Sequence, residues 1–315
     1  DRSVAVGHRA LLSYTQGGDA YITAVGYNAG SNSTTAGQFT AVGGSCLASQ
    51  TTANYNTGMG YYAMASTTTG GANTAIGRSA LYANQTGAHN TAFGYNTLVN
   101  STSGPNTALG SDALTLNTSG IQNTAVGAYA LDANTTASNS TAVGHSALGS
   151  NTTGAGNTAI GTFALLSNQT ANYNTAIGYD AGKNITTGPS NVCVGGFSGD
   201  AITTGQENTA VGYSSLSTGT DIRYAAALGR SALQYATGWY LTAVGYHALQ
   251  QNTSGQYNTA VGSRALDANT TAGSNTAVGF DALGANTTGA SNTAVGDIAL
   301  DANTTASFNT AVGRA

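Results

Sequence analysis

The stretch Asn123-Thr124-Ala125-Val126-Gly127 decides the fold, because its pattern recurs along the whole chain. Nineteen glycines, from Gly7 to Gly313, each close one copy, and fifteen of the eighteen intervals between them are 17 residues long. Two of the other intervals are shorter by a single residue, and the remaining one, between Gly7 and Gly26, is slightly longer. A long insertion would break a stack of coils, so this strict period predicts that each repeat is one coil stacked on the next.

The residue types in each repeat predict β-structure. Counting from the closing glycine, position −3 is Thr in sixteen copies, and position −2 is Ala in all but the Gly58 and Cys193 copies. Position −1 is always apolar, and the repeat ends in turns such as Asn151-Thr152-Thr153-Gly154. Thr and Val favour strands, whereas Asn and Gly favour turns. We therefore expect an all-β solenoid, a parallel β-roll or β-helix of about nineteen 17-residue coils with two short strands each.

Asparagine occupies position −4 in thirteen copies. Buried asparagines in register can bond to the copies above and below, as in stacked strands. We expect one continuous repeat array over residues 1–315, with irregular coils around residues 1–26 and 215–245. We interpret this array as a piece of a longer fibre.

Composition excludes several classes of partner. Charged residues make up 6% of the chain, the net charge is −4, and the eight Lys and Arg residues are scattered singly. A nucleic-acid interface needs a basic patch, so we expect no nucleic-acid partner. The chain also lacks an uninterrupted apolar run long enough to cross a bilayer, so we expect no membrane span in this segment.

Alternation along the strand places the −3 and −1 side chains on one face and the −2 side chain on the other. The −1 column is apolar throughout, so we expect it to be buried. The −2 column is kept small, which favours a second copy packed against it and hence a homotrimer. The alternative is that small residues simply fit the cramped interior of a thin coil.

The phrases Ser3-Val4-Ala5-Val6-Gly7 and Asn-Thr-Ala-Val-Gly-Tyr-x-Ala-Leu resemble the head repeats of trimeric autotransporter adhesins. They resemble equally the repeated shafts of bacteriophage tail fibres. The resemblance covers essentially all of the chain, although adhesin heads generally have somewhat shorter coils. It implies a left-handed β-roll, a homotrimer, and a role in surface adhesion or as a fibre.

The sequence predicts no catalytic site, metal site or cofactor, and hence no enzyme. Its four histidines are dispersed, and no pair of carboxylates is placed for acid–base chemistry. Cys46 and Cys193 each replace an alanine in a small-residue column, and we expect them to behave as small buried hydrophobes.

Asn-x-Ser/Thr sequons recur at position +7, counted forward from the glycine. N-linked sugars there would form a line along the array, whereas the same residues are also simply favourable in turns. The candidate glycosylation sites are Asn84, Asn117, Asn134, Asn151, Asn168, Asn252, Asn269, Asn286 and Asn303.

The best candidate for a glycan or receptor contact lies where the repeat is least regular. Tyr224, Tyr240 and Tyr257 share position −5 in three consecutive coils, so we expect them to stack about 4.8 Å apart. Trp239 is adjacent in sequence, and Arg230 is a further candidate. Exposed aromatic rings can stack on sugars, and the alternative is stacking within the array or at a subunit seam.

These observations favour a structural and adhesive fibre shaft, outside the cell, on a cell surface or on a virion tail. Such a shaft would self-associate and would project or contribute binding to a surface glycan or protein receptor. A secreted filament built by end-to-end stacking is the alternative. An ice-binding β-solenoid is a minor alternative, because it needs an exposed, flat Thr-x-Thr array.

Overall fold

A computed structural model describes residues 2–15 and 20–314 of the chain. They form two compact units, Asp1–Gly156 and Asn157–Ala315. Each unit is an all-β parallel solenoid in which every repeat of the sequence forms one coil. The described residues include no helix, and so no helix long and apolar enough to cross a membrane. The continuity of the array between residues 156 and 157 stays a prediction, as does its left-handed sense.

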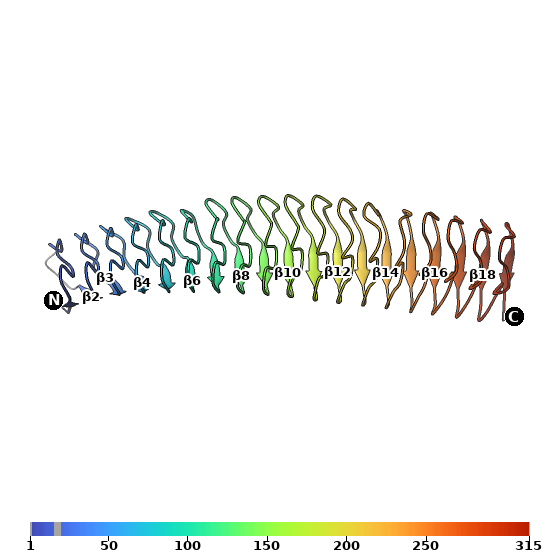
Figure 1. Ribbon diagram of the computed structural model, residues 1–315, viewed down its shortest axis with the longest axis horizontal. Helices are drawn as coiled ribbons and strands as arrows, with labels where there is room; N and C mark the ends of the chain where they lie inside the picture. Colours follow the sequence, from blue (N-terminus) through green and yellow to red (C-terminus); the bar gives the residue numbers. More distant parts are fainter. Residues whose placement is uncertain (1, 16–19, 315) are drawn as a thin grey trace. The chain divides into compact units, whose positions relative to one another are not determined.

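The first unit is a sheet in which each strand pairs with the next in parallel (Figure 1). Each residue of the Thr-Ala-Val phrase is paired with the equivalent residue of the following coil, so paired residues are one repeat apart in the sequence. The strands are β1 (Val4–Val6), β2 (Tyr21–Val25), β3 (Gln38–Val42), β4 (Asn56–Met59), β5 (Thr74–Ile76), β6 (Thr91–Phe93), β7 (Thr107–Leu109), β8 (Thr124–Val126) and β9 (Thr141–Val143).

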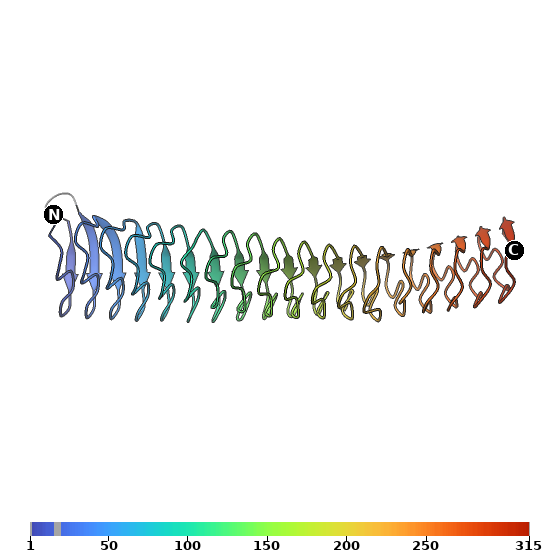
Figure 2. The same ribbon diagram turned by 90° about the horizontal axis from the view of Figure 1, so that it is seen from above.

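The second unit repeats this arrangement with ten strands in parallel, in-register pairs (Figure 1). Seen from above in Figure 2, its coils follow one another in a single row, and the strands move to the upper edge of the view toward the C-terminal coils. The strands are β10 (Thr158–Ile160), β11 (Thr175–Ile177), β12 (Val192–Val194), β13 (Thr209–Val211), β14 (Ala226–Leu228), β15 (Thr242–Val244), β16 (Thr259–Val261), β17 (Thr276–Val278), β18 (Thr293–Val295) and β19 (Thr310–Val312).

Each coil contains one strand, so the expectation of two strands per coil is wrong for the described residues. The reason lies in the backbone after the glycine, where His247 and Leu249 adopt φ of 57° and 52°. Residues in the left-handed region cannot continue an extended strand. The segment is nevertheless bonded to its neighbour, since the Leu249 N–H donates to the carbonyl of Ala265 at 3.0 Å.

The glycine that closes each repeat is required by its backbone. Gly212 has φ +134°, and a Cβ added to it would lie 2.5 Å from the carbonyl oxygen of Gly229 in the next coil. A side chain there would be strained and would also push the two coils apart. This close approach explains why the repeat always carries glycine at this position.

The buried face of the strand is the opposite of the one that we expected. The alanines at position −2, such as Ala260 and Ala277, are fully buried, whereas Val261 and Val278 at position −1 are each 37% exposed. The interior is narrow because the residue at +4, usually Leu, projects into it from the other side of the coil. A Cβ added to Gly58 at position −2 would lie 3.6 Å from Leu47. The small column therefore fits a thin interior, and the apolar column lies outside.

Two columns of asparagine bond the coils together inside this narrow core. At position −4, Asn275 Oδ1 accepts the backbone N–H of Asn292 at 2.9 Å, and Asn275 Nδ2 donates to the Gly289 carbonyl at 2.9 Å. At position +7, Asn286 Nδ2 donates to Asn269 Oδ1 at 3.0 Å. The predicted ladder at −4 is confirmed. Most of its bonds join a side chain to the backbone of a neighbouring coil, and some also join two amides, as from Asn208 Nδ2 to Asn191 Oδ1 at 2.9 Å. A second amide-to-amide ladder runs at +7.

Replacing Ala277 and Val278 separately by leucine tests which face of the strand is inside. Ala277→Leu should lower the free energy of unfolding by about 1–3 kcal/mol, because three carbons must enter a packed interior. Val278→Leu should lower it clearly less, because the side chain of Val278 lies outside the packed interior of the coil. Urea unfolding followed by circular dichroism measures both. Equal losses from the two variants would contradict the facing described here.

Asn275→Ala tests the ladder at −4. The substitution leaves the buried Asn292 N–H without its acceptor and removes one of the two amide donors to the Gly289 carbonyl, which keeps Asn286 Nδ2. We therefore expect a loss of about 1–3 kcal/mol. Ser274→Ala, an exposed change one residue away, is the matched control and should be close to neutral. Hydrogen exchange provides a local measurement, since the Asn292 amide should exchange faster in Asn275→Ala and at the native rate in Ser274→Ala. An unchanged rate would rule out this role for Asn275.

Candidate functional site

Three tyrosines form a continuous stack on one edge of the second unit. The ring centroids of Tyr224 and Tyr240 are 5.1 Å apart and those of Tyr240 and Tyr257 are 5.2 Å apart, with the planes within 13° and 6° of parallel. All three residues have positive φ, between 56° and 59°, which turns each ring the same way. The predicted stacking is therefore confirmed.

The geometry of this stack limits what the tyrosines can bind. Tyr240 has a neighbouring tyrosine ring against each face, and Tyr224 and Tyr257 each have one face covered in the same way. A sugar stacks on the face of an aromatic ring, so the middle of the stack offers only ring edges and hydroxyl groups. The stack thus stabilises the turn edge more than it provides a flat platform for a ligand.

Trp239 is held beside this stack by two contacts from the preceding coil. Its indole Nε1–H donates to the backbone carbonyl of Asp221 at 3.0 Å, and the guanidinium of Arg223 lies over its ring at 5.3 Å from the centroid. The same guanidinium donates to Asp221 Oδ1 at 2.9 Å through Nη2 and at 3.1 Å through Nε. Thr204 Oγ1 also donates to Asp221 Oδ1, at 3.2 Å. Trp239 is 36% exposed, so its orientation is fixed at the surface.

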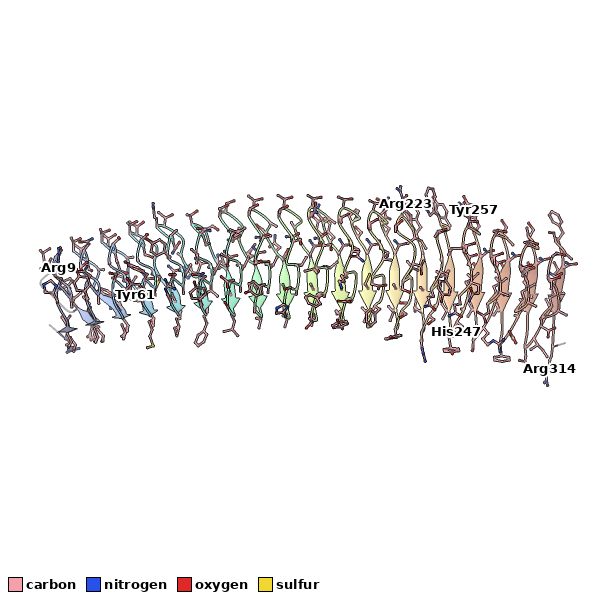
Figure 3. All side chains as sticks on the ribbon, viewed as in Figure 1. Arg9, Tyr61, Arg223, His247, Tyr257 and Arg314 are labelled. Atoms are coloured by element: carbon pink, nitrogen blue, oxygen red, sulfur yellow. The ribbon has the colours of Figure 1, made fainter. Side chains whose placement is uncertain are left out.

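Arg230 lies elsewhere. Its guanidinium is over the ring of Tyr213, at 5.9 Å from the centroid, and its carbonyl accepts the backbone N–H of His247 at 3.1 Å. Figure 3 shows His247 on the edge opposite to Arg223 and Tyr257. The basic residue beside Trp239 is thus Arg223 and not Arg230, which the sequence analysis selected.

A shallow depression of about 290 Å³ opens beside Trp239. Its walls come from three consecutive turns and combine an indole with hydroxyl groups, a carboxylate and an amide. The lining residues are Thr220, Asp221, Thr237, Gly238, Trp239, Ser254 and Gln256. Sequence reasoning found only Trp239 among them, because the others look like ordinary turn residues until the coils are stacked.

The core under this depression differs from that of the regular coils. Ala225 and Leu241 stand at position −4 in place of asparagine, and both are buried. Ile222 is also fully buried, at a position that holds Gly or Ala in most coils. The ladder reaches the Ala225 N–H, which donates to Asn208 Oδ1 at 3.0 Å, and apolar contacts replace it over the next two coils.

A second depression in the second unit, of about 310 Å³, is lined by one arginine and three aspartates. Arg264 Nε lies 3.7 Å from Asp267 Oδ2 and 3.9 Å from Asp281 Oδ1. Burial raises the pKa of Asp267, whereas His247 and Arg264 oppose that rise. The lining has one guanidinium for three carboxylates, so it keeps an excess of negative charge. No group of three or more His, Cys, Asp or Glu residues within 2–15 and 20–314 could hold a metal ion.

The sequon asparagines are inside the fold, which favours the turn interpretation over N-linked sugars. Eight of them are fully buried and Asn303 is partly buried. Asn269 Nδ2, for example, donates to Asn252 Oδ1 at 2.7 Å and to the Ala272 carbonyl at 3.0 Å. A glycan on that nitrogen would replace one of its two N–H donors and place a sugar in the core. The buried positions are Asn84, Asn117, Asn134, Asn151, Asn168, Asn252, Asn269 and Asn286.

No protein-family model matches the chain, and no curated protein sequence matches it. The function must therefore be argued from the surface and the site.

The two cysteines are buried thiols without a disulfide. Burial raises the pKa of Cys46 and of Cys193 from 9.0 to about 12, so both remain protonated in the folded chain well above neutral pH. The reactive species is the thiolate. The folded state consequently loses stability as the pH rises from about 9, where unfolded thiols ionise, toward 12.

Alkylation with iodoacetamide tests this state of the cysteines. At pH 8 the native chain should remain unlabelled over a period in which the urea-unfolded chain takes up label on both thiols, as counted by mass spectrometry. Rapid labelling of either cysteine in the native chain would show that its thiol is accessible and ionises normally.

Proposed function

We propose that this chain is the shaft of a structural, adhesive fibre, in which parallel copies associate through the exposed face of the sheet. The observation that carries the proposal is the apolar column at position −1. In the second unit it exposes Ile160, Ile177, Val211, Leu228, Val244, Val261, Val278 and Val295, each between 36% and 40%.

The residues around this column strengthen the argument. None of the strands β10 to β19 contains a charged residue, although an exposed sheet face or edge normally carries charge that prevents association. Ten strands about 4.8 Å apart present a face on the order of 45 Å long. Its apolar area is several hundred Å², comparable with the largest patches on monomeric proteins, which are often interaction sites.

Exposed aromatic residues lie just beyond this column, at position +1. Tyr179, Tyr213, Tyr246 and Phe280 are each about half exposed, and Tyr213 belongs to a chain of edge-to-face contacts with Phe197. Aromatic side chains are enriched in protein interfaces. They extend the apolar column along its border.

The course of the column suits an assembly of parallel copies. Because it crosses every strand, copies aligned in the same direction can bury it over many coils at once, and closed rings of identical subunits satisfy such contacts. A homotrimer is the ring that the resemblance to adhesin heads and tail-fibre shafts implies. We therefore propose a trimeric shaft outside the cell, on a cell surface or virion tail, that carries or contributes receptor binding.

Two other functions would use the same surfaces differently. A secreted filament would grow by stacking coils end to end. Ice binding has one supporting observation, since half-buried Thr at −3 and exposed Val at −1 form a Thr-x-Val array on the outer face of the sheet. The uncharged, apolar character of the array favours burial against a second copy.

Light scattering after size exclusion tests the assembly. The native chain should have three times the mass of one chain. A variant with Val244→Glu, Val261→Glu and Val278→Glu should fall to the mass of one chain, because a charge buried without a partner is strongly unfavourable. The matched control adds the same three charges on the turn edge, with Thr271→Glu, Ser274→Glu and Ser291→Glu, and should keep the native mass.

Circular dichroism of both variants should match the native chain, which separates dissociation from unfolding. A native chain with the mass of one chain would overturn the proposal and would favour the ice-binding alternative. Particles of indefinite length would favour the filament.

A further inference from the structure

We propose that the depression beside Trp239 is a binding site for a neutral saccharide. The inference rests on the proposed adhesive function and names the class of ligand and the residues that recognise it. Sugar recognition needs an aromatic surface for the apolar C–H face of the ring and polar groups for its hydroxyls. The depression provides both.

The aromatic wall is preorganised. The bond from Trp239 Nε1 to the Asp221 carbonyl and the guanidinium of Arg223 over the ring fix the indole before any ligand arrives. Trp239 lines the depression and Arg223 does not, so the indole is the aromatic surface that a ligand there would meet. Rigid placement of this kind reduces the entropy lost on binding.

The polar wall suits hydroxyl groups. Thr220, Ser254 and Gln256 are exposed and come from consecutive turns. Threonine and serine hydroxyls can donate and accept hydrogen bonds, and the glutamine amide can do both as well. A sugar hydroxyl, which is also both donor and acceptor, matches each of these groups.

The charge of the site selects neutral over acidic sugars. Asp221 is the carboxylate among the lining residues, and none of them is cationic. Arg223 compensates that carboxylate through contacts at 2.9 and 3.2 Å. A uronic or sialic acid would bring a second carboxylate close to Asp221 without a free cation to receive it. A neutral saccharide meets no such repulsion.

The size of the site indicates weak binding of one or two sugar rings. A volume of about 290 Å³ is at the lower limit for small-molecule sites, which begin near about 300 Å³. A shallow site of this size gains avidity when several copies bind one glycan surface together. The proposed shaft provides that repetition, because each copy carries one such site.

The chain contains a single tryptophan, so its fluorescence reports on this site alone. We would titrate the native protein with the methyl glycosides of glucose, galactose, mannose and N-acetylglucosamine, with glucuronate and N-acetylneuraminate as acidic counterparts. At least one neutral glycoside should shift the tryptophan emission saturably. The acidic sugars should bind at least about tenfold more weakly, a difference that Asp221→Asn should reduce.

Saturation-transfer difference NMR extends the test to variants without the reporter. Trp239→Ala should weaken binding at least about tenfold, and Trp239→Phe should restore part of it, since an aromatic ring remains. Tyr173→Ala removes an exposed aromatic residue from position −5 of a distant coil, the position of the stacked tyrosines, and should bind as the native chain does.

Two results would overturn the inference: no saturable response to any neutral glycoside, or equal binding by Trp239→Ala and the native chain. Both can be told apart from failure of the fibre proposal. Trp239→Ala should keep the native mass by light scattering, because Trp239 is on the turn edge and outside the apolar column.

Discussion

The close stacking of glycine on glycine is the constraint on which the other features depend. In each coil the backbone passes so near its neighbour that the space for a Cβ is filled by the next carbonyl oxygen, as at Gly212 and Gly229. This contact fixes the register at one repeat per strand. Because every column is then in register, asparagine can bond to asparagine, tyrosine can stack on tyrosine, and an apolar position repeated in the sequence becomes a continuous column on the surface.

Much of the fold could be predicted from this period, whereas the face of the strand that is buried could not. Alternation along Thr-Ala-Val defines two faces, but it does not say which one is inside. The usual rule that the larger apolar residue is buried fails here because the coil is thin. Leu at +4 already fills the interior, so only Ala at −2 fits opposite it and Val at −1 must lie outside. The size of the interior depends on positive φ at +2 and +4. Most residues at these positions are not glycine, so the sequence does not indicate that their φ is positive.

The candidate site shows the same division. Residues in one column, such as Tyr224, Tyr240 and Tyr257, could be placed together by counting alone. Contacts between different columns could not, because they depend on how the turn folds. Arg230 and Arg223 are both near Trp239 in sequence, yet the turn places Arg223 on the indole and Arg230 on Tyr213. The two interpretations of the sequons could likewise not be separated by sequence, because only the folded turn shows that their asparagines form a buried ladder.

The position of the depression within the array has a physical reason. An asparagine ladder is directional and needs its partner at a fixed place in the next coil, so it tolerates little change in the turn. The coil between Gly229 and Gly245 is one residue shorter than the regular coil and has Ala236 where that coil has asparagine at +7. Around it, buried Ile222 and Leu241 replace directional bonds by apolar contacts, which depend on volume more than on angle. The exchange of a polar ladder for an apolar core allows this turn to depart from the repeat, and a turn that departs from the repeat can form a site that the regular coils lack.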